Sequence, residues 1–136
     1  MSRGTFASLA ALVSLVNAVP ALVAPDAIAS LYGVTLDRQT LLLGQMLAAS
    51  YFGYAAINWT TRDASELRSR RGIAPGNLVA WAIGCVLWTY AAASGLTNAV
   101  GWIVVGLSVV FTLGWAYFTF ADRGIESRTT VASATR

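Results

Sequence analysis

The sequence contains no histidine and no lysine, and each absence excludes a class of chemistry. Without histidine there is no imidazole ligand for haem, zinc or copper, and no Ser-His catalysis. Without lysine, a Schiff base to retinal and a lysine nucleophile are excluded as well. The single cysteine, Cys85, cannot form a disulfide within the chain, and its place in an apolar run indicates a small packed side chain.

Charge is also scarce. Only 11% of the 136 residues are charged and 57% are hydrophobic, with a mean hydropathy of +0.63. Soluble domains carry about 25% charged residues, so this composition predicts one integral membrane domain. The net charge is +3, but the basic residues stand beside apolar runs. That placement indicates membrane orientation and a lipid bilayer as partner, and no nucleic acid.

Four apolar runs have lengths near the ~20 residues that cross a ~30 Å hydrocarbon core. We predict an all-α polytopic membrane protein, a four-transmembrane-helix bundle over residues 1–122, followed by a mobile cytoplasmic tail over 123–136. The first run also resembles a secretory signal peptide, but Pro25 after the candidate cleavage site and the later apolar runs favour a span. The predicted spans are 5–24, 41–59, 78–93 and 99–120.

The arginines are distributed unequally among the connecting segments. Arg38 alone lies between the first and second spans, and no arginine lies between the third and fourth. The positive-inside rule therefore predicts that both termini and the charged loop 62–72 are cytoplasmic. The other eight arginines lie on that predicted inner side: Arg3, Arg62, Arg68, Arg70, Arg71, Arg123, Arg128 and Arg136.

Two segments are predicted on the outer side. Pro25 and Asp26 favour a helix start and Gly33 a left-handed helix stop, so residues 25–33 are predicted to form a short interfacial helix. A polar turn with Asp37 follows, and residues 94–98 form a second turn. A lipid-modifying enzyme would need an acid or nucleophile on this side, and Asp26, Asp37 and Tyr32 are the only candidates.

The predicted spans contain no charged side chain, which counts against proton-coupled transport and drug export. We therefore predict no catalytic residue, metal site or cofactor. Asn17 and Gln45 are the candidate intramembrane polar contact, either a hydrogen bond between helices or part of a site for a neutral solute or lipid head group. Trp88, Tyr90, Trp102, Phe111 and Trp115 are interpreted as packing or lipid-facing aromatics, with an aromatic cofactor cage as the alternative.

Two further sets are candidate contact residues. Arg68, Arg70 and Arg71 are candidates for contact with anionic lipid head groups, at about 1 kcal/mol each near the surface. Small residues at four-residue spacing let a neighbouring helix approach closely, and they predict helix packing. These candidates are Gly44, Ala48, Ala49, Gly53, Ala80 and Gly84.

The segment P-D-A-I-A-S-L-Y-G-V at 25–34, after one span and before three others, resembles that of small bacterial four-helix membrane proteins of the DoxX-like type. The resemblance implies a multi-pass protein of the bacterial cytoplasmic (inner) membrane and supplies no catalytic residue. We predict a non-catalytic accessory or assembly subunit that packs against a larger membrane complex or against itself. The alternative is a small oligomeric transporter or channel for a neutral solute or lipid, which requires a cavity that reaches Asn17 and Gln45.

Overall fold

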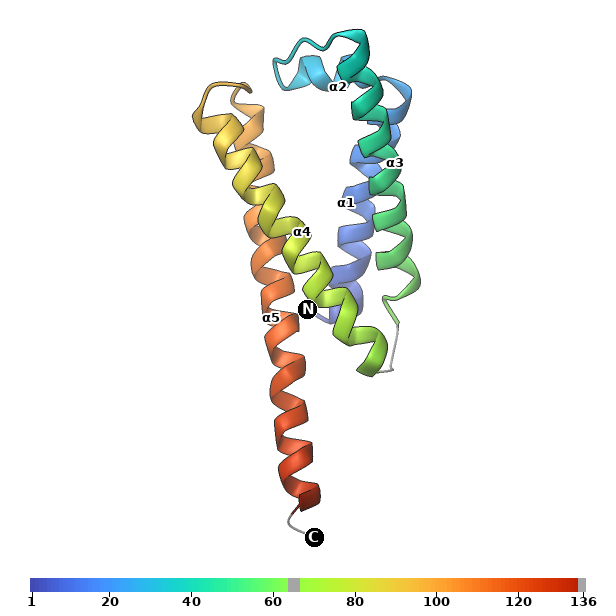
Figure 1. The fold of residues 1–136 in the computed structure, drawn as a ribbon, viewed down its shortest axis with the longest axis vertical. Coiled ribbons are helices and arrows are strands. Elements are labelled where there is room, and N and C mark those ends of the chain that lie inside the picture. The colour runs from blue at the N-terminus through green and yellow to red at the C-terminus, as the bar shows by residue number, and fades with distance from the viewer. Residues whose placement is uncertain (64–66, 135–136) are drawn as a thin grey trace.

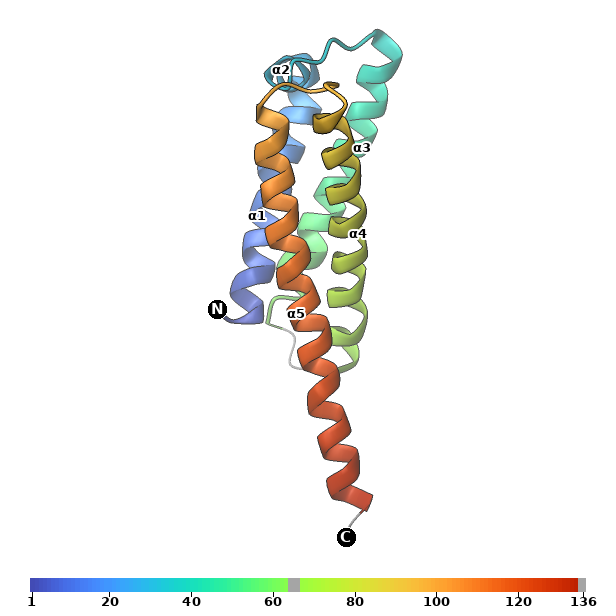
Figure 2. The ribbon, with the colours of Figure 1, turned by 90° about the vertical axis from the view of Figure 1, so that its left-hand side faces the viewer.

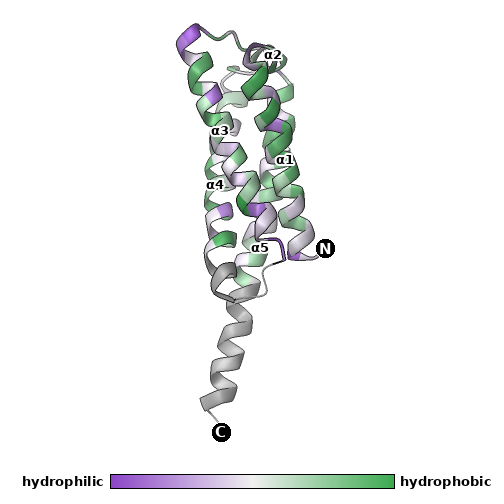
Figure 3. Cartoon of the chain, turned by 90° about the vertical axis from the view of Figure 1, so that its right-hand side faces the viewer, coloured by the Kyte–Doolittle hydropathy of each residue, from purple (hydrophilic) through white to green (hydrophobic). Residues whose placement is uncertain are grey.

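The computed structural model describes residues 1–63 and 67–134, and the side chains of 1–63 and 72–120. This part of the chain is helical apart from short connections (Figure 1). Four of the helices contain segments long and apolar enough to cross a membrane, and hydrophobic residues run along their length (Figure 3). The helices are α1 (Arg3–Val23), α2 (Pro25–Leu31), α3 (Arg38–Thr60), α4 (Leu67–Ala93) and α5 (Val100–Ala134).

The long helices pack as two hairpins. In one, α1 lies along α3 with the short helix α2 across the end of the pair; in the other, α4 lies along α5. The hairpins converge at the end of the molecule where the N-terminus lies and separate toward α2 (Figure 1). Figure 2 shows α4 and α5 side by side along the second hairpin. The predicted four-helix arrangement is therefore two closely packed pairs with a looser interface between them.

Aromatic side chains fill the interface where the hairpins converge. Phe6 of α1 lies against Phe111 and Trp115 of α5, with ring centroids 5.1 Å apart in both pairs. Trp81 of α4 stacks on Phe111 at 4.5 Å, and the ring of Phe118 lies 5.5 Å from that of Phe6. We call Phe6, Trp81, Phe111, Trp115 and Phe118 the aromatic cluster. Its centre is closed to solvent, since Phe6 is 3% exposed and Trp115 0%.

At the opposite end the hairpins meet through the turn between α4 and α5. Asn98 donates from its backbone N–H to the Tyr32 carbonyl at 2.9 Å and from Nδ2 to the Leu31 carbonyl at 3.0 Å. These carbonyls stand at the C-terminal end of α2, where a helix has no partners of its own for them. The ring of Tyr32 also lies 5.1 Å from that of Trp88. We call this set of interactions the α2 contact.

Glycines end the two helices that lead into the α2 contact. Gly33 has φ of +74° and Gly95 +70°, values that a residue with a Cβ rarely adopts. The Val34 N–H bonds to the Ala29 carbonyl and the Leu96 N–H to the Ala91 carbonyl, both at 2.9 Å. Both ends therefore have the hydrogen bond of a Schellman motif, and the predicted helix stop at Gly33 is confirmed.

Two element bounds differ from the prediction by more than one helical turn. The helix α4 begins at Leu67, inside the predicted charged loop and ahead of the predicted span 78–93, and Pro75 lies within the helix. Leucine and arginine favour helix, and the one backbone hydrogen bond that Pro75 removes does not end it. The helix α5 continues through Ala134, whereas the predicted span ends at 120. The mobility of 123–136 stays a prediction.

Candidate functional site

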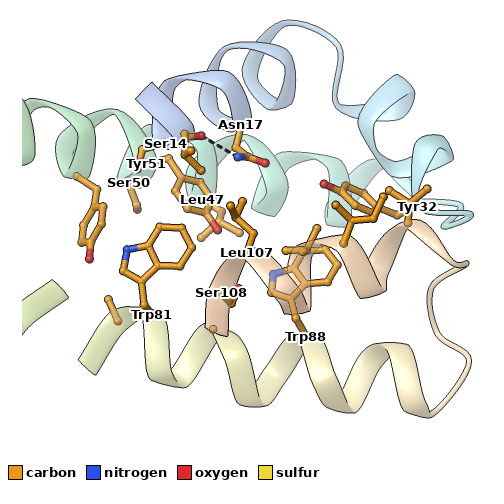
Figure 4. A pocket seen from close by; sticks show the side chains of 17 residues that line it. Ser14, Asn17, Tyr32, Leu47, Ser50, Tyr51, Trp81, Trp88, Leu107 and Ser108 are labelled. Carbon is orange, nitrogen blue, oxygen red and sulfur yellow. Dashed lines mark hydrogen bonds between the residues drawn. The ribbon is translucent and has the colours of Figure 1, made fainter. Parts of the chain in front are cut away.

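A cavity of about 420 Å³ lies between the hairpins. It extends from Tyr32 and Trp88 near the α2 contact to Trp81 of the aromatic cluster (Figure 4), and Tyr54 also lines it. It is open to the outside of the protein, since lining residues such as Ile103 are exposed. The other lining residues are Val13, Ser14, Asn17, Leu47, Ser50, Tyr51, Ala80, Gly84, Val100, Val104, Leu107 and Ser108.

Helical spacing explains how each helix contributes to the wall. On α3, Leu47, Ser50, Tyr51 and Tyr54 fall on one face because residues three and four apart are neighbours on a helix. The same spacing on α4 directs Ala80, Trp81, Gly84 and Trp88 into the cavity. The small residues Ala80 and Gly84 alternate with the two tryptophans, and this alternation leaves space between the indole rings.

Most polar groups of α1 and α3 in the wall bond to their own helix. The Ser14 hydroxyl donates to the Ala10 carbonyl at 2.8 Å, and Asn17 Nδ2 donates to the Val13 carbonyl at 2.8 Å. The Ser50 hydroxyl donates to the Met46 carbonyl at 3.4 Å. These bonds use the two hydroxyl donors and one of the two N–H groups of Asn17, so this side of the cavity offers side-chain oxygens as acceptors and one amide N–H in an apolar setting.

One donor of the opposite wall has no partner. The indole nitrogen of Trp81 is buried and has no hydrogen-bond partner among the described residues, and because it has almost no accessible surface it does not face the open space of the cavity. A buried N–H without a partner costs free energy, and native proteins leave few of them.

No lining residue carries a charge, and the only ionisable groups in the wall are tyrosine hydroxyls. Burial raises the pKa of the Tyr32 hydroxyl at the α2 contact above its ordinary value, so it is neutral at physiological pH. Within residues 1–63, 72–120 and the other described positions, no three His, Cys, Asp or Glu residues lie close enough to hold a metal ion. The cavity therefore offers apolar contact and uncharged hydrogen bonds.

The predicted polar pair occupies two separate places. Gln45 donates to the Leu22 carbonyl at 3.1 Å, across the first hairpin, and Asn17 lines the cavity. Leu22 lies in the last turn of α1, whose carbonyls lack partners within the helix, so Gln45 supplies one of them. The two amides thus bond to different groups and not to each other. The cavity reaches Asn17 and not Gln45.

The small residues predicted for helix packing also differ in environment. Ala48 is 0% exposed in the first hairpin, whereas Ala49 is exposed. A Cβ added at Gly44, Gly53 or Gly84 would meet no atom within 4 Å. These three glycines therefore make no close helix contact within the described part of the chain.

The remaining candidates lie away from the cavity. The Asp37 carboxylate accepts from the Thr40 N–H at 2.8 Å and so caps the start of α3, and Asp26 is exposed in the first turn of α2. Phe111 and Trp115 pack in the aromatic cluster, whereas Tyr90 and Trp102 are exposed. The side chains of Arg68, Arg70 and Arg71 lie outside the part of the chain that the structure describes.

Sequence reasoning missed several residues at the site. Tyr54 joins the hairpins, since its hydroxyl donates to the Asn77 carbonyl at 3.4 Å. Asn58 and Asn77 are buried near this junction, and each donates Nδ2 to its own helix. Trp81 gave a signal in the sequence, because its spacing to Gly84 and Trp88 places all three on one face of a helix.

Comparison with protein-family models, curated proteins and solved structures finds no match to this chain. The resemblance of residues 25–34 to the DoxX-like membrane proteins therefore stays a prediction.

Proposed function

We propose that this protein is a non-catalytic, multi-pass protein of the bacterial cytoplasmic membrane that binds one uncharged, mainly apolar molecule between its two hairpins. The cavity carries this proposal: its volume falls in the range of small-molecule sites, and its wall is apolar with a few polar groups. Four helices of membrane-spanning length support the location. The eight arginines on one predicted side, against Arg38 on the other, support cytoplasmic termini.

This function shares with the predicted oligomeric transporter or channel only the binding of a neutral solute or lipid, since the cavity reaches Asn17 and not Gln45. The exposed residue Ile103 lines the cavity from a helix of membrane-spanning length, so in a bilayer a lipid-like molecule enters beside Ile103 from the membrane. The lining contains no charge to neutralise a charged ligand, and burying an unpaired charge is costly.

The test fills the cavity without disturbing the packing. Gly84 lines the cavity and Gly106 lies outside it on α5, and neither glycine has an atom within 4 Å of an added Cβ. Gly84→Leu therefore places a side chain in the cavity, while Gly106→Leu, the matched control, places one on the outer surface. Both replacements gain similar helix propensity.

The readout is quenching of tryptophan fluorescence in lipid nanodiscs by 9,10-dibromo-octadecan-1-ol, since Trp81 and Trp88 line the cavity. We expect saturable quenching in the wild type and in Gly106→Leu, with binding about tenfold weaker in Gly84→Leu as the contact of about two methylenes is displaced. Equal saturable quenching in all three proteins would show that the probe binds elsewhere.

A second candidate function is the predicted accessory or assembly subunit. The specific observation in its favour is that Gly44 and Gly53 adjoin open space and Ala49 is exposed, so the small-residue positions of α3 remain available to another helix. Purification in mild detergent followed by mass analysis of co-purifying subunits tests it. A stoichiometric partner that Gly53→Leu releases would support it; a chain that travels alone would not.

A further inference from the structure

The tyrosine hydroxyls of the cavity wall indicate which uncharged group a bound molecule carries. Three tyrosines line the cavity: Tyr32 at the end of α2, and Tyr51 and Tyr54 on α3. The Tyr54 hydroxyl is already engaged, because it donates to the Asn77 carbonyl at 3.4 Å. The Tyr32 and Tyr51 hydroxyls have no hydrogen-bond partner among the residues that the structure describes.

These two hydroxyls can be reached from the cavity. Both side chains are half-buried, and neither hydroxyl oxygen belongs to the buried polar atoms that lack a partner. The Trp81 nitrogen and the side-chain oxygens of Asn58 and Asn77 do belong to that group, so an occupant cannot reach them. Tyr32 and Tyr51 also lie close enough for their hydroxyls to interact electrostatically. Both tyrosines therefore offer a free O–H to the same space between the hairpins (Figure 4).

A free hydroxyl at the depth of Tyr51 is costly. Tyr51 lies near the middle of α3, a helix of membrane-spanning length. In a bilayer its hydroxyl is therefore in the hydrocarbon region, where water does not supply the missing partner. A polar group without a hydrogen bond in that setting costs free energy, and a ligand that supplies the partner recovers it.

The missing partner is an acceptor. A phenol is more acidic than an alcohol, so a tyrosine hydroxyl donates strongly and accepts weakly. A carbonyl oxygen is a strong uncharged acceptor, and its two lone pairs can accept from two donors. A carboxylate accepts more strongly still, but the wall has no positive charge to balance it. A plain hydrocarbon leaves both hydroxyls without a partner.

Building on the function proposed above, we propose that the bound molecule is an uncharged lipid with a carbonyl oxygen, such as a neutral acyl ester, held by hydrogen bonds from Tyr51 and Tyr32. Its hydrocarbon chain lies along Leu47, Val104 and Leu107, which line the same cavity. The occupant therefore keeps its carbonyl group inside the protein, whereas the ester groups of phospholipids stay near the membrane interface.

Two probes with the same carbon chain test this selectivity: 9,10-dibromo-octadecane and methyl 9,10-dibromo-octadecanoate. Each is titrated into nanodiscs as a mole fraction of lipid, and binding is measured by quenching of tryptophan fluorescence. We expect the ester to bind the wild type about three- to tenfold more tightly than the hydrocarbon, the fold-change of one or two uncharged hydrogen bonds.

Tyr51→Phe keeps the ring and removes only the hydroxyl. The preference for the ester over the hydrocarbon should therefore fall to about onefold to threefold, with hydrocarbon binding unchanged. Tyr32→Phe should lower the preference as well, and the double variant should abolish it.

Tyr54→Phe is the matched control. It removes one hydroxyl from the same helix and the same cavity wall, but this hydroxyl is already bonded to the Asn77 carbonyl. The preference for the ester should therefore persist. Comparing the ester with the hydrocarbon within each variant also removes any general effect of the substitution on the shape of the cavity.

The two proposals fail in different ways. If no probe gives saturable quenching that Gly84→Leu weakens, the binding function itself is overturned. If hydrocarbon and ester bind the wild type equally, or if the double variant of Tyr32 and Tyr51 retains the wild-type preference, the cavity still binds a ligand but the carbonyl selectivity is overturned. The same holds if Tyr54→Phe lowers the preference as much as Tyr51→Phe does.

Discussion

The two ends of the interface between the hairpins are built differently. At the end near the N-terminus, interlocked rings exclude solvent, and Trp115 at their centre is 0% exposed. At the other end the hairpins meet through two hydrogen bonds from Asn98 and one ring contact between Tyr32 and Trp88. The cavity lies between these ends.

This difference shows where the interface is fixed and where it is adaptable. Close packing gives a unique arrangement, since a packed core tolerates few changes of volume. A few hydrogen bonds hold two surfaces together without filling the space beside them. The aromatic cluster thus sets the position of the hairpins, and the α2 contact covers a space that stays available to a ligand.

The largest expected effect comes from removing the central ring of the aromatic cluster. Trp115→Ala should lower the free energy of unfolding by about 3 kcal/mol, because buried aromatic truncations cost roughly 3 to 5 kcal/mol and lipid weakens the hydrophobic part. Reversible unfolding in mixed micelles with increasing dodecyl sulfate measures it. Trp102→Ala, on the same helix at a residue that is 52% exposed, should change stability by less than about 0.5 kcal/mol.

The second effect tests the packing from the opposite direction, by adding an atom. A Cβ at Gly114 would overlap the Phe6 ring, so Gly114→Ala should cost about 1 to 3 kcal/mol in the same unfolding measurement. Gly106→Ala, eight positions earlier on α5 with no atom within 4 Å, should be neutral or slightly stabilising. If Gly114→Ala lowered the free energy of unfolding no more than Gly106→Ala does, the Phe6 ring would have space to move away from the added Cβ.

The sequence allowed the helices and their ends to be predicted better than their packing. Long apolar runs identify membrane-length helices by length and composition alone, and Gly33 marks a helix end through its permitted φ. The start of α4 lies well before the predicted span 78–93, because the apolar run that marks a span does not mark the helical residues ahead of it, and local propensity extends the helix to Leu67.

The cavity was beyond prediction for a physical reason. In an apolar span, side chains that face lipid and side chains that face another helix are both apolar, so periodicity does not separate the faces. Leu47 in the cavity and Leu42 on the exposed surface of α3 are the same residue type. The aromatic residues carried a signal for packing. That signal does not distinguish Trp81, which lines the cavity, from Trp115, which is fully buried.

The third prediction concerns the α2 contact. Asn98→Ala removes the hydrogen bond from Nδ2 to the Leu31 carbonyl and the one that Oδ1 accepts from the Val100 N–H at 2.9 Å. We expect each lost hydrogen bond to lower the free energy of unfolding by at most about 1 kcal/mol. We also expect faster entry of the dibromo alcohol into the cavity, measured by stopped-flow quenching of tryptophan fluorescence. Asn98→Asp keeps an acceptor for Val100 but loses the donor, so it should show the faster entry with a smaller loss of stability.

The smallest effect is a dependence on pH at the start of α3. The Thr40 hydroxyl and N–H both donate to the Asp37 carboxylate, and these bonds hold the pKa of that carboxyl below its ordinary value. A lowered folded-state pKa means that the ionised form stabilises the fold. This contribution is complete above the unfolded-state pKa of about 3.9 and is lost as pH falls through the lower folded-state value.

Asp37→Asn isolates this titration, because the amide oxygen still accepts from Thr40 and no longer ionises. The expected result is a small fall in stability of the wild type between pH 5 and pH 2 that Asp37→Asn lacks, since the pair is exposed and screened by water. Asp37 does not line the cavity, so its titration should leave ligand binding unchanged. If acid weakened binding in the wild type and not in Asp37→Asn, the start of α3 would be coupled to the cavity, and the α2 end would be less independent than its few contacts indicate.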